Sequence, residues 1–301
     1  MTQQLPSRPV AGILWMIFTG LCFVGVTALV KLLGDRVPPE QSAFLRYVFG
    51  LVFLIPMIRP ILRTRITPKL HALFAFRGML HAIGVMLWFY AMTRISLAEV
   101  TAMNYLSPIY ITLGAALFLG EPLAFRRIAA IGAAFLGALV ILRPGFRELD
   151  PGHIAMLVTG LVFGGSYLLV RFTVTRTNPA VVVGMLSIWV TLGLAPFAWA
   201  VWVTPSLSDL VILFGVACFA TAGHYAMTLA LQAAPVSVTQ PVTFLQLIWA
   251  TALGVIAFGE AIDGWVLFGG GMIMAAVSFI AWREARLRRQ ASVETPVRAG
   301  T

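Results

Sequence analysis

The sequence has few charged residues, and acidic residues are the scarcest among them. Only 11% of the 301 residues are charged, with 11 Asp and Glu against 21 Lys and Arg, whereas 60% are apolar. Soluble globular domains carry about 25% charged residues. This composition excludes an ordinary soluble protein, because many apolar side chains must face lipid as well as each other.

Other absences exclude further classes. The only cysteines, Cys22 and Cys218, lie in apolar stretches, which argues against a disulfide framework. There is no Gly-rich phosphate loop ending in Gly-Lys-Ser/Thr, so the chain lacks the motif of an ATP-driven pump. No His-Glu-x-x-His motif and no paired intramembrane aspartates occur. We therefore expect no catalytic residue, metal or cofactor; a membrane-embedded enzyme and a non-transporting scaffold or sensor are the rival hypotheses.

Long charge-free runs are present instead. Residues 10–30, 100–120, 151–170 and 264–282 contain no charged residue, and a helix needs about 20 residues to cross the hydrocarbon core of a bilayer. The predicted spans are 10–33, 40–58, 70–92, 97–119, 126–143, 152–171, 180–203, 209–232, 236–259 and 264–283. The predicted fold class is an all-α membrane protein with ten transmembrane helices.

Basic residues separate to one side of these spans. With both termini in the cytoplasm, fourteen Lys and Arg lie in cytoplasmic segments and only four, at 36, 94, 143 and 147, lie on the other side. Cytoplasmic loops carry an excess of Lys and Arg, and an odd number of spans would mix the two sets. The net charge of +10 is thereby explained by topology, without a nucleic-acid partner.

The chain contains an internal repeat. Residues 19–31 and 159–171 are identical at seven of thirteen positions, and Lys31 is matched by Arg171. Gly120-Glu121 recurs as Gly259-Glu260, and Gly84 matches Gly223 at nearly the same offset. Because each unit holds five spans, the second unit enters the bilayer with the opposite orientation. Such inverted repeats occur in many secondary transporters and favour alternating access.

Two local patterns give a resemblance to a known family. One is Leu119-Gly120-Glu121-Pro122-Leu123 with Arg126-Arg127, ending in Val140-Ile141-Leu142-Arg143-Pro144-Gly145; the other is Arg77-Gly78 with Trp88-x-Tyr90-Ala91. With the repeat, the chain resembles the ten-helix EamA branch of the drug/metabolite transporter superfamily. The resemblance implies repeats at 10–145 and 150–285, a cytoplasmic tail at 286–301, and ATP-independent transport through a cavity lined mainly by spans 1, 3, 4, 6, 8 and 9.

The third span carries the most informative candidates. Arg77, His81, Gly84 and Trp88 follow helical spacing and share one face. Intramembrane ionisable residues usually face the bundle interior or a water-filled cavity, so this stripe is predicted to point inward. The alternative for Arg77 is a side chain that extends to the cytoplasmic interface.

Further candidates lie in four other spans. His224 sits near the middle of the eighth span, as a cavity residue or a structural histidine, and either His81 or His224 could couple transport to protons. Pro108 and Pro241 interrupt the fourth and ninth spans, and paired interruptions in repeats point to a binding site, although simple kinks remain the alternative. The complete predicted substrate-binding set is Arg77, His81, Trp88, Asn104, Tyr105, Tyr167, His224, Gln240 and Phe244.

Charged residues at span ends receive structural interpretations. We expect Glu121 and Glu260 to cap helices or form hinges in preference to carrying protons, and Lys31 and Arg171 to anchor at the interfaces. Arg46 is a candidate partner for Glu99.

No Asp or Glu lies deep in any span, so an organic cation would find no counter-charge. The lining suits a neutral, zwitterionic or anionic planar solute. The best specific hypothesis is inner-membrane uptake of a vitamin such as riboflavin; export of amino acids or related metabolites or drugs is the alternative. The expected partners are this small molecule and the lipid bilayer, with a homodimer left open.

Overall fold

The apolar segments form helices because only a helix satisfies its own backbone hydrogen bonds within a bilayer. The computed structural model describes residues 8–121, 124–174, 177 and 179–294. Among these residues, nine helical segments are long and apolar enough to cross a membrane. The bounds of the unbroken helices are α1 (Pro9–Leu33), α4 (Pro68–Arg94), α7 (Phe125–Leu142), α8 (Pro151–Val174), α9 (Pro179–Ala200), α10 (Leu207–Ala233) and α13 (Gly264–Glu294).

The predicted second span is not among these nine segments. It consists of α2 (Pro39–Leu51), a 3₁₀ segment η2 (Val52–Met57) and the short α3 (Ile58–Arg63), so it ends beyond the expected residue 58. The segment still follows α9 from end to end: Gln41 Nε2 donates to Val203 O at 2.7 Å, and Ile61 lies against Gly184. In the described residues the second span is thus a broken segment that packs along α9, beside the nine long ones.

The fourth and ninth spans are broken near their prolines, as the sequence predicts. The fourth consists of α5 (Leu97–Asn104) and α6 (Ser107–Leu119), separated by a turn at Tyr105 and Leu106. The ninth consists of α11 (Val236–Thr239), the 3₁₀ turn η3 (Gln240–Thr243) and α12 (Phe244–Phe258). The two breaks meet, because the Tyr105 hydroxyl donates to Thr243 O at 2.8 Å.

Helix contacts follow the inverted repeat. Helix α1 packs antiparallel to α10, with Arg8 N donating to Ala233 O at 2.8 Å. In the repeat, α8 corresponds to α1 and α4 corresponds to α10. These two helices also pack together, and His81 on α4 and Ser166 on α8 form a hydrogen bond of 3.2 Å. The remaining equivalent helices pair with each other: α2 with α9, α5 with α12, and α7 with α13. This exchange is what a two-fold axis in the membrane plane requires.

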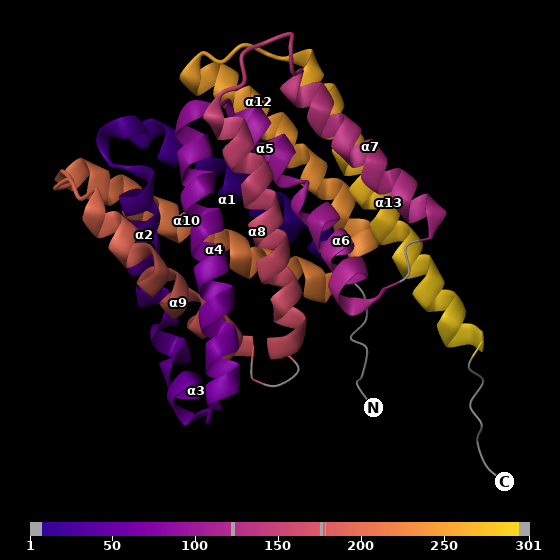
Figure 1. Cartoon of the computed structure of the whole chain (residues 1–301), viewed down its shortest axis with the longest axis horizontal. Helices are drawn as coiled ribbons and strands as arrows, with labels where there is room; N and C mark the ends of the chain where they lie inside the picture. The colour runs from indigo at the N-terminus through magenta and orange to yellow at the C-terminus, as the bar shows by residue number, and fades with distance from the viewer. Residues whose placement is uncertain (1–7, 122–123, 175–176, 178, 295–301) are drawn as a thin grey trace.

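Glycines allow the closest of these contacts. A Cβ atom on Gly137 would lie 2.6 Å from Gly269 O, so α7 and α13 touch backbone to backbone. Similarly, a Cβ atom on Gly164 would lie 2.8 Å from the Tyr110 Cβ, which brings α8 against α6. Gly160-x-x-x-Gly164 and Gly269-Gly270-Gly271 are the sequence patterns at these contacts, and small residues of this kind let helices approach closely. Figure 1 shows α7 and α13 side by side, away from α2, α3 and α9.

Ion pairs gather at the end of the molecule where α1 ends and α8 begins, the upper end in Figure 1. Lys31 pairs there with Glu260, and Arg147 pairs with Glu99 at 2.6 Å. Glu260 also accepts a hydrogen bond from the Leu97 N–H at 3.0 Å. The predicted capping role of Glu260 is therefore present, because this N–H begins α5 and has no partner within its own helix.

Candidate functional site

Two adjoining cavities lie between the helices of the two halves. The first, of about 370 Å³, is the central chamber, formed by residues of α1, α2, α4, α5, α6, α8, α10, η3 and α12. The second, of about 360 Å³, is the basic chamber, formed by residues of α2, η2, α4, α8, α9 and α10. Six residues line both chambers: Arg46, Tyr47, His81, Tyr167, His224 and Met227. The two cavities are thus parts of one site, of the size that holds a small organic ligand.

The predicted stripe on α4 faces these chambers. Arg77 lines the basic chamber, Trp88 the central chamber, and His81 both. Arg77 is only 5% exposed and donates from Nη1 to Val182 O at 3.3 Å. Its guanidinium is therefore held inside the bundle, against the alternative that it extends to the interface.

Aromatic rings surround His81. Its ring stacks on Phe163 with centroids 4.6 Å apart, and Tyr167 meets it edge-on at 6.2 Å. Trp88 approaches the other side of this group, 6.3 Å from Phe163. Phe163 was not among the predicted site residues, although it stands four positions before Tyr167, on the same helical face.

The two proline breaks supply amide and hydroxyl groups to the central chamber. Asn104 and Tyr105 come from the first break, and Gln240 from the second. Phe244 is the predicted site residue that lines neither chamber; its ring lies 3.8 Å from where a Cβ on Gly271 would stand, on the side of α13. The 3₁₀ turn before α12 has about 3.0 residues per turn, so a face assigned with α-helical spacing is not maintained across it. Gln246 lines the chamber instead.

His224 is the α10 member of the predicted set. It lines both chambers and meets the Phe23 ring edge-on, with centroids 5.1 Å apart. Thr228, one helical turn after His224, donates back to His224 O at 3.0 Å and lines the basic chamber. In all, the structure brings eight of the nine predicted residues to the two chambers.

Arg46 belongs to the site, and the expectation that it partners Glu99 is wrong. Arg46 lines both chambers, with its guanidinium carbon 4.1 Å from the centre of the Tyr47 ring. Glu99 instead pairs with Arg147 at 2.6 Å and with His153 at 3.2 Å. Arg46 is the only basic residue in its predicted span and lies six positions inside it, and that signal could have assigned it to the site.

A family comparison identifies the class of protein. The model of the EamA-like transporter family matches residues 10–143 and again residues 150–282. The chain belongs to the EamA-like transporter family. The two matches coincide with the two halves that the helix contacts relate by inversion.

Several similar proteins are named as transporters of a particular metabolite. The chain is 27% identical over 292 residues to a riboflavin transporter of Rhizobium johnstonii, covering 95% of each chain. It is 23% identical to a riboflavin transporter of Vibrio cholerae, covering 97% of this chain and all of the relative. It is 24% identical to an S-adenosylmethionine uptake transporter of Rickettsia prowazekii, covering 91% and 94%.

A solved crystal structure supports the fold alone. It is 20% identical, covers 90% of this chain and 97% of its own, and superposes with a TM-score of 0.59.

The cavity expected for EamA-like transporters involves spans 1, 3, 4, 6, 8 and 9, and all six contribute here. The second span contributes as well, through Arg46 and Tyr47.

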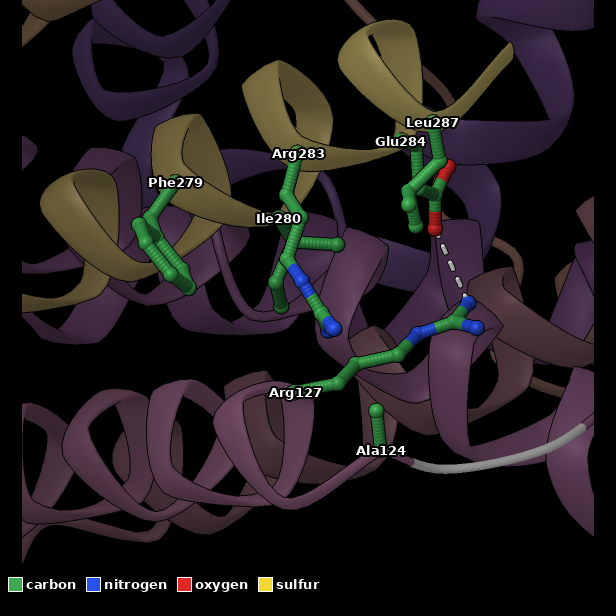
Figure 2. Close-up of a pocket in the computed structure, with 7 residues that line it drawn as sticks. All are labelled: Ala124, Arg127, Phe279, Ile280, Arg283, Glu284 and Leu287. Carbon is green, nitrogen blue, oxygen red and sulfur yellow. Dashed lines mark ion pairs between the residues drawn. The ribbon is translucent and has the colours of Figure 1, made fainter. Parts of the chain in front are cut away.

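A third and smaller pocket, of about 270 Å³, lies between the start of α7 and the last turns of α13. Figure 2 shows Arg127 extending from α7 toward Glu284 on α13, with Arg283 pointing into the same gap. Arg127 pairs with Glu284 at 3.0 Å and with Glu121 at 3.5 Å. This pocket shares no lining residue with the two chambers. The Arg127–Glu284 pair joins α7 to α13 across it.

Proposed function

We propose that this EamA-like transporter family protein carries a small planar metabolite across the inner membrane by alternating access, with riboflavin uptake as the specific hypothesis. The observation that carries the proposal is the central chamber. Trp88, Phe163 and Tyr105 offer ring surfaces there, and Asn104 and Gln240 offer hydrogen bonds. A planar heterocycle with polar edges fits such a set, because rings stack on aromatic faces and amides pair with ring carbonyl and N–H groups.

The relatives support the same class of substrate. Two of those described above are named riboflavin transporters and one an S-adenosylmethionine uptake transporter, and both substrates contain a heteroaromatic ring. The chamber favours the flavin over the sulfonium compound, because no Asp or Glu occurs among its described lining residues. A site for an organic cation normally supplies a carboxylate.

Alternating access is supported by the positions of the ion pairs. The pairs Lys31–Glu260 and Arg147–Glu99 lie at the end of the bundle where α1 ends. The basic chamber extends toward the opposite end, with Leu54 and Thr228 in its lining. The ion pairs thus close one end of the pathway, and the site extends toward the opposite end. A carrier built from inverted repeats has this geometry in each of its two states.

The proposed orientation places both termini in the cytoplasm. The fourteen-to-four separation of basic residues supports it, and the Lys31–Glu260 end is then periplasmic. The proposal includes repeats at 10–145 and 150–285, a cytoplasmic tail at 286–301, and no enzymatic activity. Proton coupling through a histidine and homodimerisation also stay predictions.

Riboflavin uptake into proteoliposomes tests the proposal. The purified protein should accumulate labelled riboflavin above protein-free vesicles, and Trp88→Ala should raise the half-saturating concentration at least several-fold, since stacking of a base on an aromatic ring is worth about 1–3 kcal/mol. Trp199→Ala is the matched control, because Trp199 is 82% exposed on α9 and lines neither chamber. Equal uptake with and without protein would refute riboflavin as the substrate; an unaffected Trp88→Ala variant would remove Trp88 from the site.

A further inference from the structure

The basic chamber presents hydrogen-bond donors without a carboxylate to accept from them. Its lining contains Arg46, Arg77, His81 and His224. Hydroxyl groups of Ser187 and Thr221 line the same space. No Asp or Glu occurs among the described lining residues. Charged groups inside a membrane are costly and persist where they bind or conduct something.

Arg77 is held so that part of its hydrogen-bonding capacity is unused. The side chain is 5% exposed and one of its nitrogens, Nη1, donates to Val182 O at 3.3 Å. Its Nε has no hydrogen-bond partner in the described part of the chain. A buried donor without an acceptor destabilises the fold, so this nitrogen suits an acceptor that the substrate brings.

Arg46 completes the positive end of the chamber. It lies where the two chambers join, since it lines both, and its guanidinium lies over the neighbouring Tyr47 ring. Glu99 and Glu260 pair with other cations at the end of the bundle. The two arginines therefore bring positive charge to the site that no described lining residue balances.

The central chamber shares Arg46 and the two histidines with the basic chamber but adds aromatic rings and neutral amides. The indole N–H of Trp88 and the hydroxyl of Ser107 line it without a hydrogen-bond partner among the described residues. An aromatic space thus opens directly into a cationic one, through a shared wall that includes His81, Tyr167 and His224.

We infer that the joined chambers bind a planar heteroaromatic metabolite that carries an anionic oxygen group, the ring lying in the central chamber and the phosphate or carboxylate at Arg46 and Arg77. This inference rests on the proposed function, because it concerns the substrate of the same site. Arginine suits the role, since its planar guanidinium pairs with both oxygens of such a group. A neutral compound such as riboflavin would leave the positive end of the site without its partner.

Paired ligands separate the contribution of the charge from that of the ring. Binding to the purified protein is measured for riboflavin and riboflavin 5′-phosphate, and for adenosine and adenosine 5′-monophosphate. In each pair the phosphorylated member should bind at least about tenfold more tightly, because hydrogen bonds to charged groups are the strong ones.

Two variants test the assigned residues. Arg46→Gln and Arg77→Gln should each reduce the preference for the phosphorylated member to under about threefold. The preference is a ratio within one variant, so a loss of affinity that affects both members equally does not lower it. An unaltered gel-filtration profile shows that the variant is folded. Arg65→Gln is the matched control: Arg65 is exposed in the loop between α3 and α4, and the preference should persist in it.

Each outcome decides between the two proposals. Equal affinity within both pairs, or a preference that survives both arginine substitutions, overturns the anionic-group inference and leaves riboflavin transport standing. Failure of both flavins to bind while the nucleotide exceeds adenosine refutes the riboflavin hypothesis and retains the inference. If none of the four compounds binds, both proposals fail.

Discussion

The Lys31–Glu260 pair offers the sharpest test of alternating access, because it holds α1, α5 and α12 together at one end. Glu260 contacts Lys31 and accepts from the Leu97 N–H at 3.0 Å, and Lys31 also donates to Ile95 O at 2.8 Å. The two side chains are 18% and 13% exposed, so the pair is shielded from water more than an ordinary surface pair. Lys31→Ala should therefore open this end.

The size of the effect follows from these contacts. Removing Lys31 eliminates a charge-assisted contact with Glu260 and a hydrogen bond to Ile95 O, and hydrogen bonds to charged groups contribute about 1.5–3 kcal/mol. With a discount for partial exposure, we assign about 2 kcal/mol to the facing in which this end is closed. Since 1.4 kcal/mol is a factor of ten, the population open at this end should rise about thirtyfold.

Accessibility of a single cysteine measures that population. Cys22 and Cys218 are first replaced by serine, and Gln246 in the central chamber is replaced by cysteine. A membrane-impermeant thiol reagent added to the outside of cells then labels the chamber only when the Lys31–Glu260 end is open. The labelling rate should rise about thirtyfold in Lys31→Ala, and Lys31→Arg should restore slow labelling because it keeps the charge.

The matched control is the pair Arg94–Asp150 at the same end. Its atoms are 3.8 Å apart and its side chains are 46% and 34% exposed, so Arg94→Ala should change the labelling rate by less than about fivefold. If Lys31→Ala, still able to bind substrate, is labelled no faster than the parent, the pair does not hold this end closed and the interpretation of the ion pairs is refuted.

Three further predictions address coupling, topology and packing. His224→Gln should flatten the pH dependence of transport while downhill exchange persists, because His224 faces the chambers as an exposed side chain whereas His81 is buried against Phe163. The proposal fails if His224→Gln and His81→Gln both keep the parental pH profile while a proton ionophore abolishes accumulation. A reporter fused after residue 289 should be active only in its cytoplasmic form, and a periplasmic signal would contradict the proposed orientation. Gly269→Val should lower the thermal unfolding midpoint by several degrees, since a Cβ there would lie 2.5 Å from Gly137 O; Gly132→Val, with open space at its Cβ, is the control, and equal midpoints would mean that α7 and α13 separate at little cost.

The sequence predicted most of the fold because bilayer physics acts on local composition. Charge-free runs of the right length mark spans, and prolines mark the breaks that the structure shows before α6 and α12. The broken second pass escaped detection, since its apolar residues continue through a 3₁₀ segment and hydropathy does not distinguish 3₁₀ from α-helical geometry.

The candidate site was predictable where helical spacing applies. Arg77, His81 and Trp88 face the chambers because α4 is one unbroken helix. Phe244 follows a 3₁₀ turn, so its direction could not be extrapolated. The partner of Glu99 was unpredictable for another reason: Arg147 lies in the connection between α7 and α8, and spacing along a helix says nothing about contacts that loops bring together.

In an inverted repeat, the contacts that close one end of the pathway have counterparts that close the other end. Lys31 and Glu260 close one end, and their sequence counterparts in the other half are Arg171 and Glu121, which the inversion assigns to the opposite end. The preferred facing then depends on the difference in free energy between closing one end and closing the other. Strengthening the contacts at both ends equally would slow the cycle without changing its resting position, whereas strengthening those at one end alone would change it. Substitution at position 171 should bias the carrier in the direction opposite to substitution at position 31.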